Sequence, residues 1–91
     1  MKYVLLGSIS PSWIGKQDER LKKSNEKLKQ LGIKQVSVLY TQGQYDFIET
    51  IEAPGPSSVL GFTIWYAKKG FGTIQTLPAL EDKEIRKIIK G

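Results

Sequence analysis

The sequence predicts one α+β domain, built on a four-stranded antiparallel sheet with two main helices and an extra C-terminal helix. The chain has 91 residues, which is the length of one domain. Its apolar residues follow strand-type and helix-type spacing in the order strand, helix, strand, strand, helix, strand. Glycine and proline residues stand where several of these segments are expected to end. We therefore treat residues 1–91 as a single domain.

The first half of the chain predicts a strand, a helix and a second strand. Residues 2–9 are mostly apolar, which is typical of a strand that is buried on both faces. The Ser-Pro-Ser stretch at 10–12 ends this strand and can begin a helix. One helix is expected over about residues 13–31, with Gly32 as its C-terminal stop. Residues 33–41 alternate between apolar and polar side chains, as a second strand does.

The second half predicts a hairpin partner, a helix, a strand and a short terminal helix. A Gln42-Gly43 turn joins the second strand to a third over residues 45–52. A helix follows at about 57–69, and a fourth strand spans 72–78 and stops at a proline. The terminal helix runs from 82 to 90. Its apolar residues are expected to face inward: Ile85, Ile88 and Ile89.

These elements make two β-α-β halves, which together predict a ferredoxin-like βαββαβ sandwich. Right-handed connections put both main helices on the same face of the sheet. Val36, Val38 and Tyr40 of the second strand are expected to meet the helices, which leaves Leu39 on the open face with Ile48. A monomer seldom leaves such an apolar face in water. The expected partner is therefore the chain itself, in a homodimer or a larger homo-oligomer that forms through the open sheet face.

The composition excludes several kinds of chemistry. The chain has no cysteine and no histidine, so it lacks thiolate chemistry, the commonest general base and the commonest zinc ligand. No metal and no cofactor is expected. The net charge of +5 suits nucleic acid or anionic lipid, but many lysines lie near acids, which favours a solvated surface. No apolar run is long enough for a signal peptide or a membrane span, so a cytoplasmic location is expected and no membrane partner.

A motif at the hairpin resembles the signature of a known family. Gly43-Gln44-Tyr45-Asp46 is similar to the Gly-x-Tyr-Asp sequence for which the GYD domain family is named. The resemblance covers nearly the whole chain, and further positions carry it: Arg20, Gly32, Tyr40, Glu52-Ala53-Pro54, Gly70, Thr76, Ala79 and Glu84-Ile85. The Ser-Pro-Ser-Trp stretch at 10–13 replaces the family's usual Thr-x-x-Gly, and Ile74 takes a place that is often threonine.

The resemblance implies a fold and an assembly rather than a reaction. The family is similar to the dimeric α+β barrels, in which two ferredoxin-like sheets face each other. Relatives of that fold include oxygenases and small-molecule-sensing domains, so the fold alone does not decide the function.

The candidate ligand-binding residues cluster around the motif. Tyr45 supplies a phenol and Asp46 an acceptor beside Gly43, and Arg20 or Thr76 is expected within reach. A structural role competes with this interpretation, because an aspartate in a turn often binds nearby backbone and a tyrosine often packs on the core. Glu49 lies between Phe47 and Ile51 in the sequence pattern, and a salt bridge to Arg20 or a lysine is the expected way to bury it.

Three functions remain from the sequence. The favoured one is a non-catalytic oligomeric module that binds a small molecule between sheet and helices, since the chain lacks the histidine that many oxygenases use. The alternative is a small dimeric-barrel enzyme that uses Tyr45, Asp46 and Arg20 as polar groups. A weaker alternative is RNA binding, because Lys69-Gly70-Phe71-Gly72 copies the first half of the RNP1 motif. That motif belongs on a third strand that continues with stacking aromatic residues, and here it follows a helix, so nucleic acid is not the expected partner.

Overall fold

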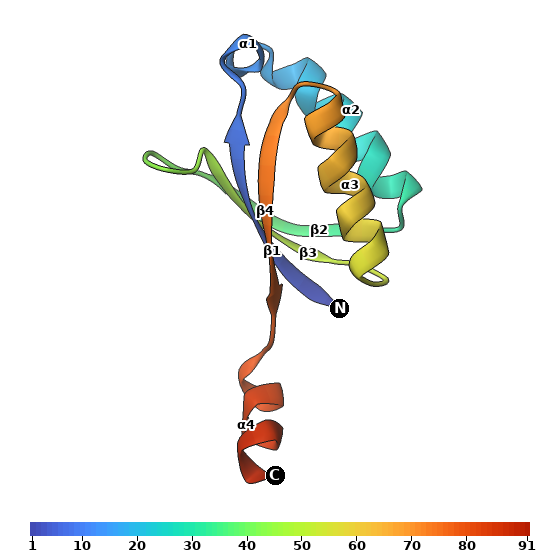
Figure 1. The fold of residues 1–91 in the computed structure, drawn as a ribbon, viewed down its shortest axis with the longest axis vertical. Coiled ribbons are helices and arrows are strands. Elements are labelled where there is room, and N and C mark those ends of the chain that lie inside the picture. Colours follow the sequence, from blue (N-terminus) through green and yellow to red (C-terminus); the bar gives the residue numbers. More distant parts are fainter.

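The fold consists of an antiparallel sheet, two helices that cover one of its faces and a terminal helix that projects from the body (Figure 1). The computed structural model describes residues 1–91. The elements in chain order are β1 Lys2–Ile9, α1 Pro11–Ile14, α2 Gln17–Gln30, β2 Lys34–Tyr40, β3 Phe47–Glu52, α3 Pro56–Lys68, β4 Gly72–Ala79 and α4 Asp82–Lys90. The predicted α+β class and the ferredoxin-like order of elements are confirmed.

The sheet has the strand order β2-β3-β1-β4, and every neighbouring pair is antiparallel. The two strands that the chain joins by a hairpin, β2 and β3, therefore lie together at one edge, and β4 forms the other edge. Pro78 is tolerated near the end of β4 because an edge strand needs hydrogen bonds on only one side. The sequence alone placed this residue at the end of the strand, and the strand in fact continues to Ala79.

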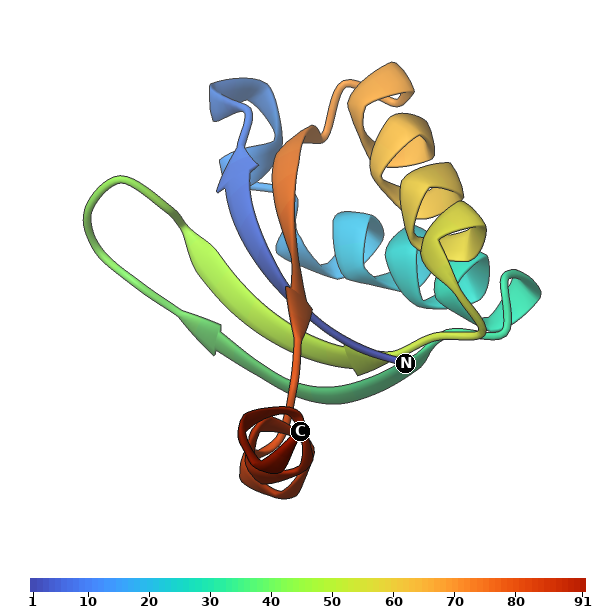
Figure 2. The ribbon, with the colours of Figure 1, turned by 60° about the horizontal axis from the view of Figure 1, so that its bottom comes forward.

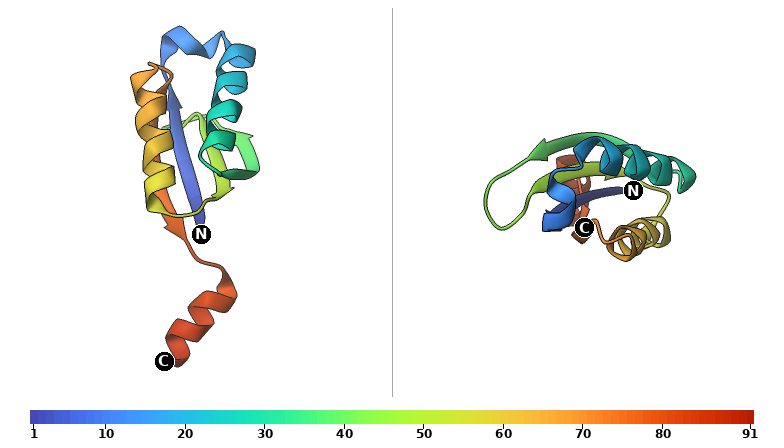
Figure 3. Two further views of the ribbon diagram at one scale, coloured as in Figure 1. Left: turned by 90° about the vertical axis from the view of Figure 1, so that its right-hand side faces the viewer. Right: turned by 90° about the horizontal axis from the view of Figure 1, so that it is seen from above.

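The core lies between the sheet and the two long helices. Figure 3 shows α2 and α3 side by side across one face of the sheet, and Figure 2 shows them above its curved strands. Alternate residues of β1 point into this layer, so Tyr3 and Leu5 are buried, while Val4 and Leu6 on the opposite face are only half-buried. The prediction that both faces of the first strand are buried is wrong for the single chain, because no helix covers the second face. The buried apolar residues are Tyr3, Leu5, Leu28, Ile33, Phe47, Ile51, Ala53, Val59, Phe62, Tyr66 and Phe71.

The first helical region differs from the prediction. A single helix over 13–31 was expected, but the chain forms the short α1, breaks at Gly15 and Lys16, and then forms α2. Gly15 ends α1, and the backbone amide of Lys16 donates to the carbonyl of Trp13. The break lets the indole of Trp13 pack edge-on against Phe71, with ring centroids 4.4 Å apart. Packing of Trp13 therefore outweighs the helical periodicity at this point.

A β-bulge in β2 changes which side chains face the helices. The register of β2 on β3 shifts by one residue between Gln35 and Ser37, so Val36 is the extra residue. Before the bulge the alternation is inverted, and Gln35 lies on the helix side, where the sequence pattern had placed Val36. The expectation that Val36 meets the helices is wrong, and Tyr40 at the end of the strand is half exposed instead of buried. Leu39 and Ile48 lie on the open face as predicted.

The terminal helix α4 begins and ends as predicted but is not part of the core. It starts with a capping box in which Glu81 and Glu84 exchange side-chain and backbone hydrogen bonds. Figure 1 shows it leading away from the end of β4, and none of its residues is buried. The expectation that Ile85, Ile88 and Ile89 face inward is therefore wrong for the single chain. The three isoleucines form an exposed apolar stripe at helical spacing.

Candidate functional site

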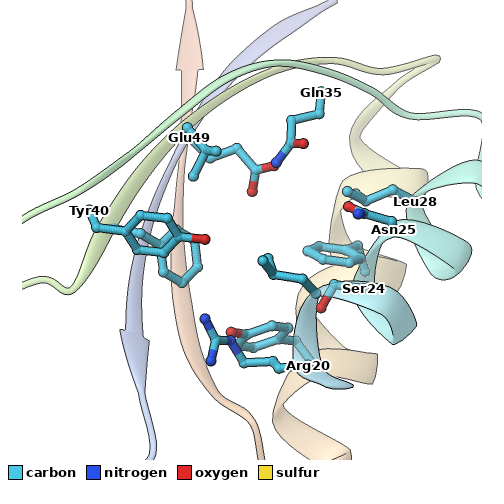
Figure 4. Close-up of a pocket in the computed structure, with 12 residues that line it drawn as sticks. Arg20, Ser24, Asn25, Leu28, Gln35, Tyr40 and Glu49 are labelled. Carbon is cyan, nitrogen blue, oxygen red and sulfur yellow. The ribbon is translucent and has the colours of Figure 1, made fainter. Parts of the chain in front are cut away.

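A cavity lies between α2 and α3 on one side and β2 and β3 on the other. Its enclosed volume is about 30 Å³. The empty space measures about 390 Å³ when the opening to solvent is included. Figure 4 shows polar side chains that converge on this space from both layers: Arg20, Ser24, Asn25, Gln35, Tyr40 and Glu49. Leu28 and Phe62 are among the apolar residues that line the rest. Polar groups that meet inside an apolar wall are the usual arrangement of a small-molecule site.

Glu49 brings a carboxyl group into the cavity from the sheet. Its position on β3 turns it toward the helices, and it is only 4% exposed. The side-chain amide of Gln35 donates a hydrogen bond to it from the neighbouring strand. Burial raises the pKa of Glu49 above its usual range, and the bond from Gln35 opposes this only in part. The salt bridge that the sequence suggested for Glu49 is not formed, because the β-bulge places an uncharged amide beside it.

Arg20 brings a positive charge into the same cavity from the opposite layer. It lies on the face of α2 that packs over the sheet, and it is only 2% exposed. Its guanidinium donates to the carbonyl oxygen of Trp13 at 3.2 Å and to Oε1 of Gln17 at 2.6 Å. Both partners are uncharged, and no salt bridge involves Arg20 or Glu49. A buried guanidinium and a buried carboxyl group thus line one cavity without forming a salt bridge.

Ser24 and two tyrosines complete the polar lining. Ser24 lies one turn after Arg20 on α2, and its buried hydroxyl oxygen has no hydrogen-bond partner. Tyr40 reaches the cavity from the end of β2, and its ring is half-exposed. Burial raises the pKa of the Tyr66 hydroxyl, and the neighbouring Arg20 works in the opposite direction. The Tyr66 hydroxyl therefore stays neutral at physiological pH and can both donate and accept.

The Tyr45–Asp46 pair, the sequence-predicted candidate, lies outside this cavity. A carboxylate oxygen of Asp46 accepts a hydrogen bond from the backbone amide of Ile9 at 2.6 Å. The backbone amide of Asp46 donates to the carbonyl of Gly7 at 2.7 Å, so Asp46 is bound to the end of β1 twice. The hydroxyl of Tyr45 donates to Oε1 of Gln75 on β4. These contacts hold the hairpin loop across β1 and β4.

A family model described as the GYD domain matches residues 3–89. This chain belongs to the GYD domain family. No curated protein and no solved structure matches the chain. The Gly-x-Tyr-Asp signature of this GYD domain thus lies in a loop whose side chains bind the backbone and side chains of neighbouring strands.

The other candidate residues of the GYD domain are not gathered at one place. Arg20 lines the cavity, whereas Gly43, Tyr45, Asp46 and Thr76 do not. Thr76 is paired with Leu5 in the register of β4 on β1. A ligand-binding role for the four residues outside the cavity stays a prediction. Ser24, Asn25 and Gln35 carry no signal in the sequence that would mark them as site residues, and for Glu49 the sequence pattern indicates only that its carboxyl group is buried.

The RNA-binding alternative loses the side chains that it needs. Tyr3, Tyr45 and Phe47 would have to face outward to stack on bases, but Tyr3 and Phe47 are buried under the helices, and the Tyr45 hydroxyl is bonded to Gln75 of β4. Phe71 of the Lys-Gly-Phe-Gly stretch is 1% exposed and contacts Trp13, Trp65 and Tyr66.

No group of three or more acidic side chains converges as a metal site would require. None of the helices combines the length and the hydrophobicity needed to cross a bilayer.

Proposed function

We propose that this GYD domain is a non-catalytic module that binds a small polar molecule in the cavity between sheet and helices. The observation that carries the proposal is the Ser24 hydroxyl, which is buried, lies against the cavity and has no partner. A buried hydroxyl without a hydrogen bond costs about 1–3 kcal/mol, so natural structures rarely leave one without a ligand or water. Arg20 and Glu49 support the same conclusion, because both side chains are buried and neither forms a salt bridge.

The available space sets the size of the occupant. The enclosed part of the cavity is small, about 30 Å³. Only a polar group of a few heavy atoms fits inside, and the remainder of a larger ligand would extend past Tyr40. The Ser24 hydroxyl in the cavity has no hydrogen bond to a base that could activate it as a nucleophile, and this favours binding over catalysis.

The proposal is tested by filling the cavity. Ser24→Leu places a larger apolar side chain against it, and Gln30→Leu makes the same type of change on the exposed surface of α2. Thermal unfolding is measured with a panel of small carboxylates, amines and amides. A ligand at 100 times its Kd stabilises the folded state by about 2.7 kcal/mol. We expect stabilisation of the wild type and of Gln30→Leu but not of Ser24→Leu. A ligand that stabilises all three proteins equally would show that its site lies elsewhere.

We also propose that the module works as a homodimer that forms through the open sheet face. Three apolar side chains form a row across β2, β3 and β1, because Leu39 pairs with Ile48 and Ile48 pairs with Leu6. Leu39 is 68% exposed and Ile48 is 38% exposed. The exposed stripe of α4 adds further apolar surface outside the core. Association costs roughly 4–15 kcal/mol of rigid-body freedom, so a whole sheet face is needed to offset it.

The dimer is tested by sedimentation at micromolar concentration with two matched lysine substitutions. Ile48→Lys puts a charge in the middle of the open face. Leu60→Lys puts the same charge on an exposed apolar position of α3, on the opposite side of the sheet. We expect a dimer for the wild type and for Leu60→Lys, and a monomer for Ile48→Lys. A wild type that sediments as a 10.2 kDa monomer would refute the assembly.

A further inference from the structure

The cavity is electrically polarised, and this limits what can fill it. Glu49 enters from β3, and Arg20 enters from α2 in the facing layer. Each is buried, and neither is paired with the other or with any further charge. A buried polar or charged group without a partner costs up to several kcal/mol, so the occupant must form hydrogen bonds to both Glu49 and Arg20.

The two ends of the cavity have different hydrogen-bonding groups free: acceptors at Glu49 and donors at Arg20. At the sheet end, Glu49 has one bond from Gln35 and keeps free acceptor positions. At the helix end, Arg20 has five N–H groups; its bonds to Trp13 and Gln17 use two of them, and the Tyr66 hydroxyl lies beside the guanidinium. The Ser24 hydroxyl, which lies on the same helix, is entirely free. An occupant must therefore donate toward Glu49 and accept from Arg20.

A charged occupant satisfies only one end. An anion would bind Arg20 but would place only acceptor atoms against the acceptor oxygens of Glu49. A cation would bind Glu49 but would be repelled by Arg20, since a guanidinium keeps its charge at any ordinary pH. A planar group with N–H donors at one end and a carbonyl oxygen at the other meets both requirements without a net charge. Four heavy atoms of this kind match the small space inside the cavity.

We propose that the cavity binds the carboxamide or urea-type group of an uncharged small molecule, with its N–H groups on Glu49 and its carbonyl oxygen on Arg20 and Ser24. This inference rests on the proposed function and specifies its ligand class. Gln35 already presents a side-chain amide to Glu49 within the chain, so the contact chemistry is the same.

Three probes of nearly the same shape test the inference on the unmodified full chain. Acetamide is neutral, acetate is its anionic counterpart, and acetamidinium is its cationic counterpart. Each is titrated to about 100 mM while NMR follows the signals of Glu49, Arg20 and Ser24, because a four-atom ligand binds weakly. We expect acetamide to bind about tenfold more tightly than either ion. Tighter binding of acetate or acetamidinium would overturn the ligand class alone, and no response to any of the three would overturn the proposed function as well.

Charge removal at one end provides a second, independent measurement. Glu49→Gln leaves Arg20 as the only charge in the cavity, so the preference is expected to move from acetamide to acetate. Glu52→Gln removes the same charge from the opposite face of the same strand and is expected to leave the preference unchanged. An unchanged preference in Glu49→Gln would overturn the assignment of Glu49 as the acceptor. Because the comparison of the three probes on the wild type needs no variant, an unstable Glu49→Gln would leave the inference testable.

Discussion

Asp46 of the Gly-x-Tyr-Asp motif is predicted to stabilise the fold rather than to bind a ligand. Its carboxylate accepts from the amide of Ile9 at 2.6 Å, at the point where β1 ends. Asp46→Ala removes this acceptor and leaves the Ile9 amide without its partner. The backbone bond from the Asp46 amide to Gly7 is unaffected by the substitution.

The size of the effect follows from the charge on the acceptor. A hydrogen bond to a charged group contributes about 1.5–3 kcal/mol, and a neutral one contributes about 1 kcal/mol. Asp46→Ala is therefore expected to lower the free energy of unfolding by roughly 2 kcal/mol, and Asp46→Asn by about 1 kcal/mol. In a domain of this size, 2 kcal/mol corresponds to a fall in Tm of about 8–16 °C.

Urea unfolding of four proteins measures the effect. The wild type, Asp46→Ala and Asp46→Asn are compared with Gln44→Ala, an exposed position of the same loop. We expect Gln44→Ala to match the wild type within about 0.5 kcal/mol. If Asp46→Ala also matches the wild type, the structural interpretation is refuted. Loss of ligand binding by a fully stable Asp46→Ala would instead support the ligand-binding role predicted from the sequence.

Three further predictions concern burial. Burial raises the folded-state pKa of Glu49, so the free energy of unfolding of the wild type falls as the pH rises from about 4.5 through that pKa. Urea unfolding as a function of pH should show that Glu49→Gln gains stability relative to the wild type at neutral pH, and an equal difference at all pH values would contradict this. Gly7→Ala would place its Cβ 1.9 Å from the Phe47 ring, so the free energy of unfolding is expected to fall by about 3 kcal/mol. The double variant with Phe47→Leu should recover part of this loss, and simple additivity of the two changes would argue against the clash. Deletion of residues 82–91 removes no buried side chain, so circular dichroism should show an intact body while sedimentation shows weaker dimerisation, and a dimer of unchanged affinity would exclude α4 from the interface.

Much of the fold could be predicted because its determinants are local. The periodicity of apolar residues separates helices from strands over a few residues, and it placed α4 with its observed bounds. Gly32 and Gly70 were expected to end the two long helices, and both adopt the positive φ that a helix stop requires. The open face with Leu39 and Ile48 followed from the same reasoning, since strand alternation and right-handed connections leave one face uncovered.

The candidate site was harder to predict because it depends on one inserted residue and on contacts between layers. The bulge at Val36 inverts the alternation of β2 and brings Gln35 onto Glu49, but no residue type in the strand marks the bulge. Arg20 was named through the family resemblance and as a possible salt-bridge partner of Glu49, but its proximity to the cavity depends on how α2 packs across the sheet. Ser24 resembles any serine on a lysine-rich helix until the packing shows that its hydroxyl is buried.

The terminal helix shows the same division between local and tertiary determinants. Its helical form is determined locally by the capping residues Glu81 and Glu84 and by apolar spacing. Its location is not determined locally, because Nζ of Lys2 forms a salt bridge with Oε1 of Glu81 at 2.6 Å and the chain then leads away from the sheet. An amphipathic pattern predicts that a helix has an apolar face to bury, but it does not identify the surface that buries it. Which groups become neighbours is decided by packing between distant segments, and the order of residues along the chain encodes this only indirectly.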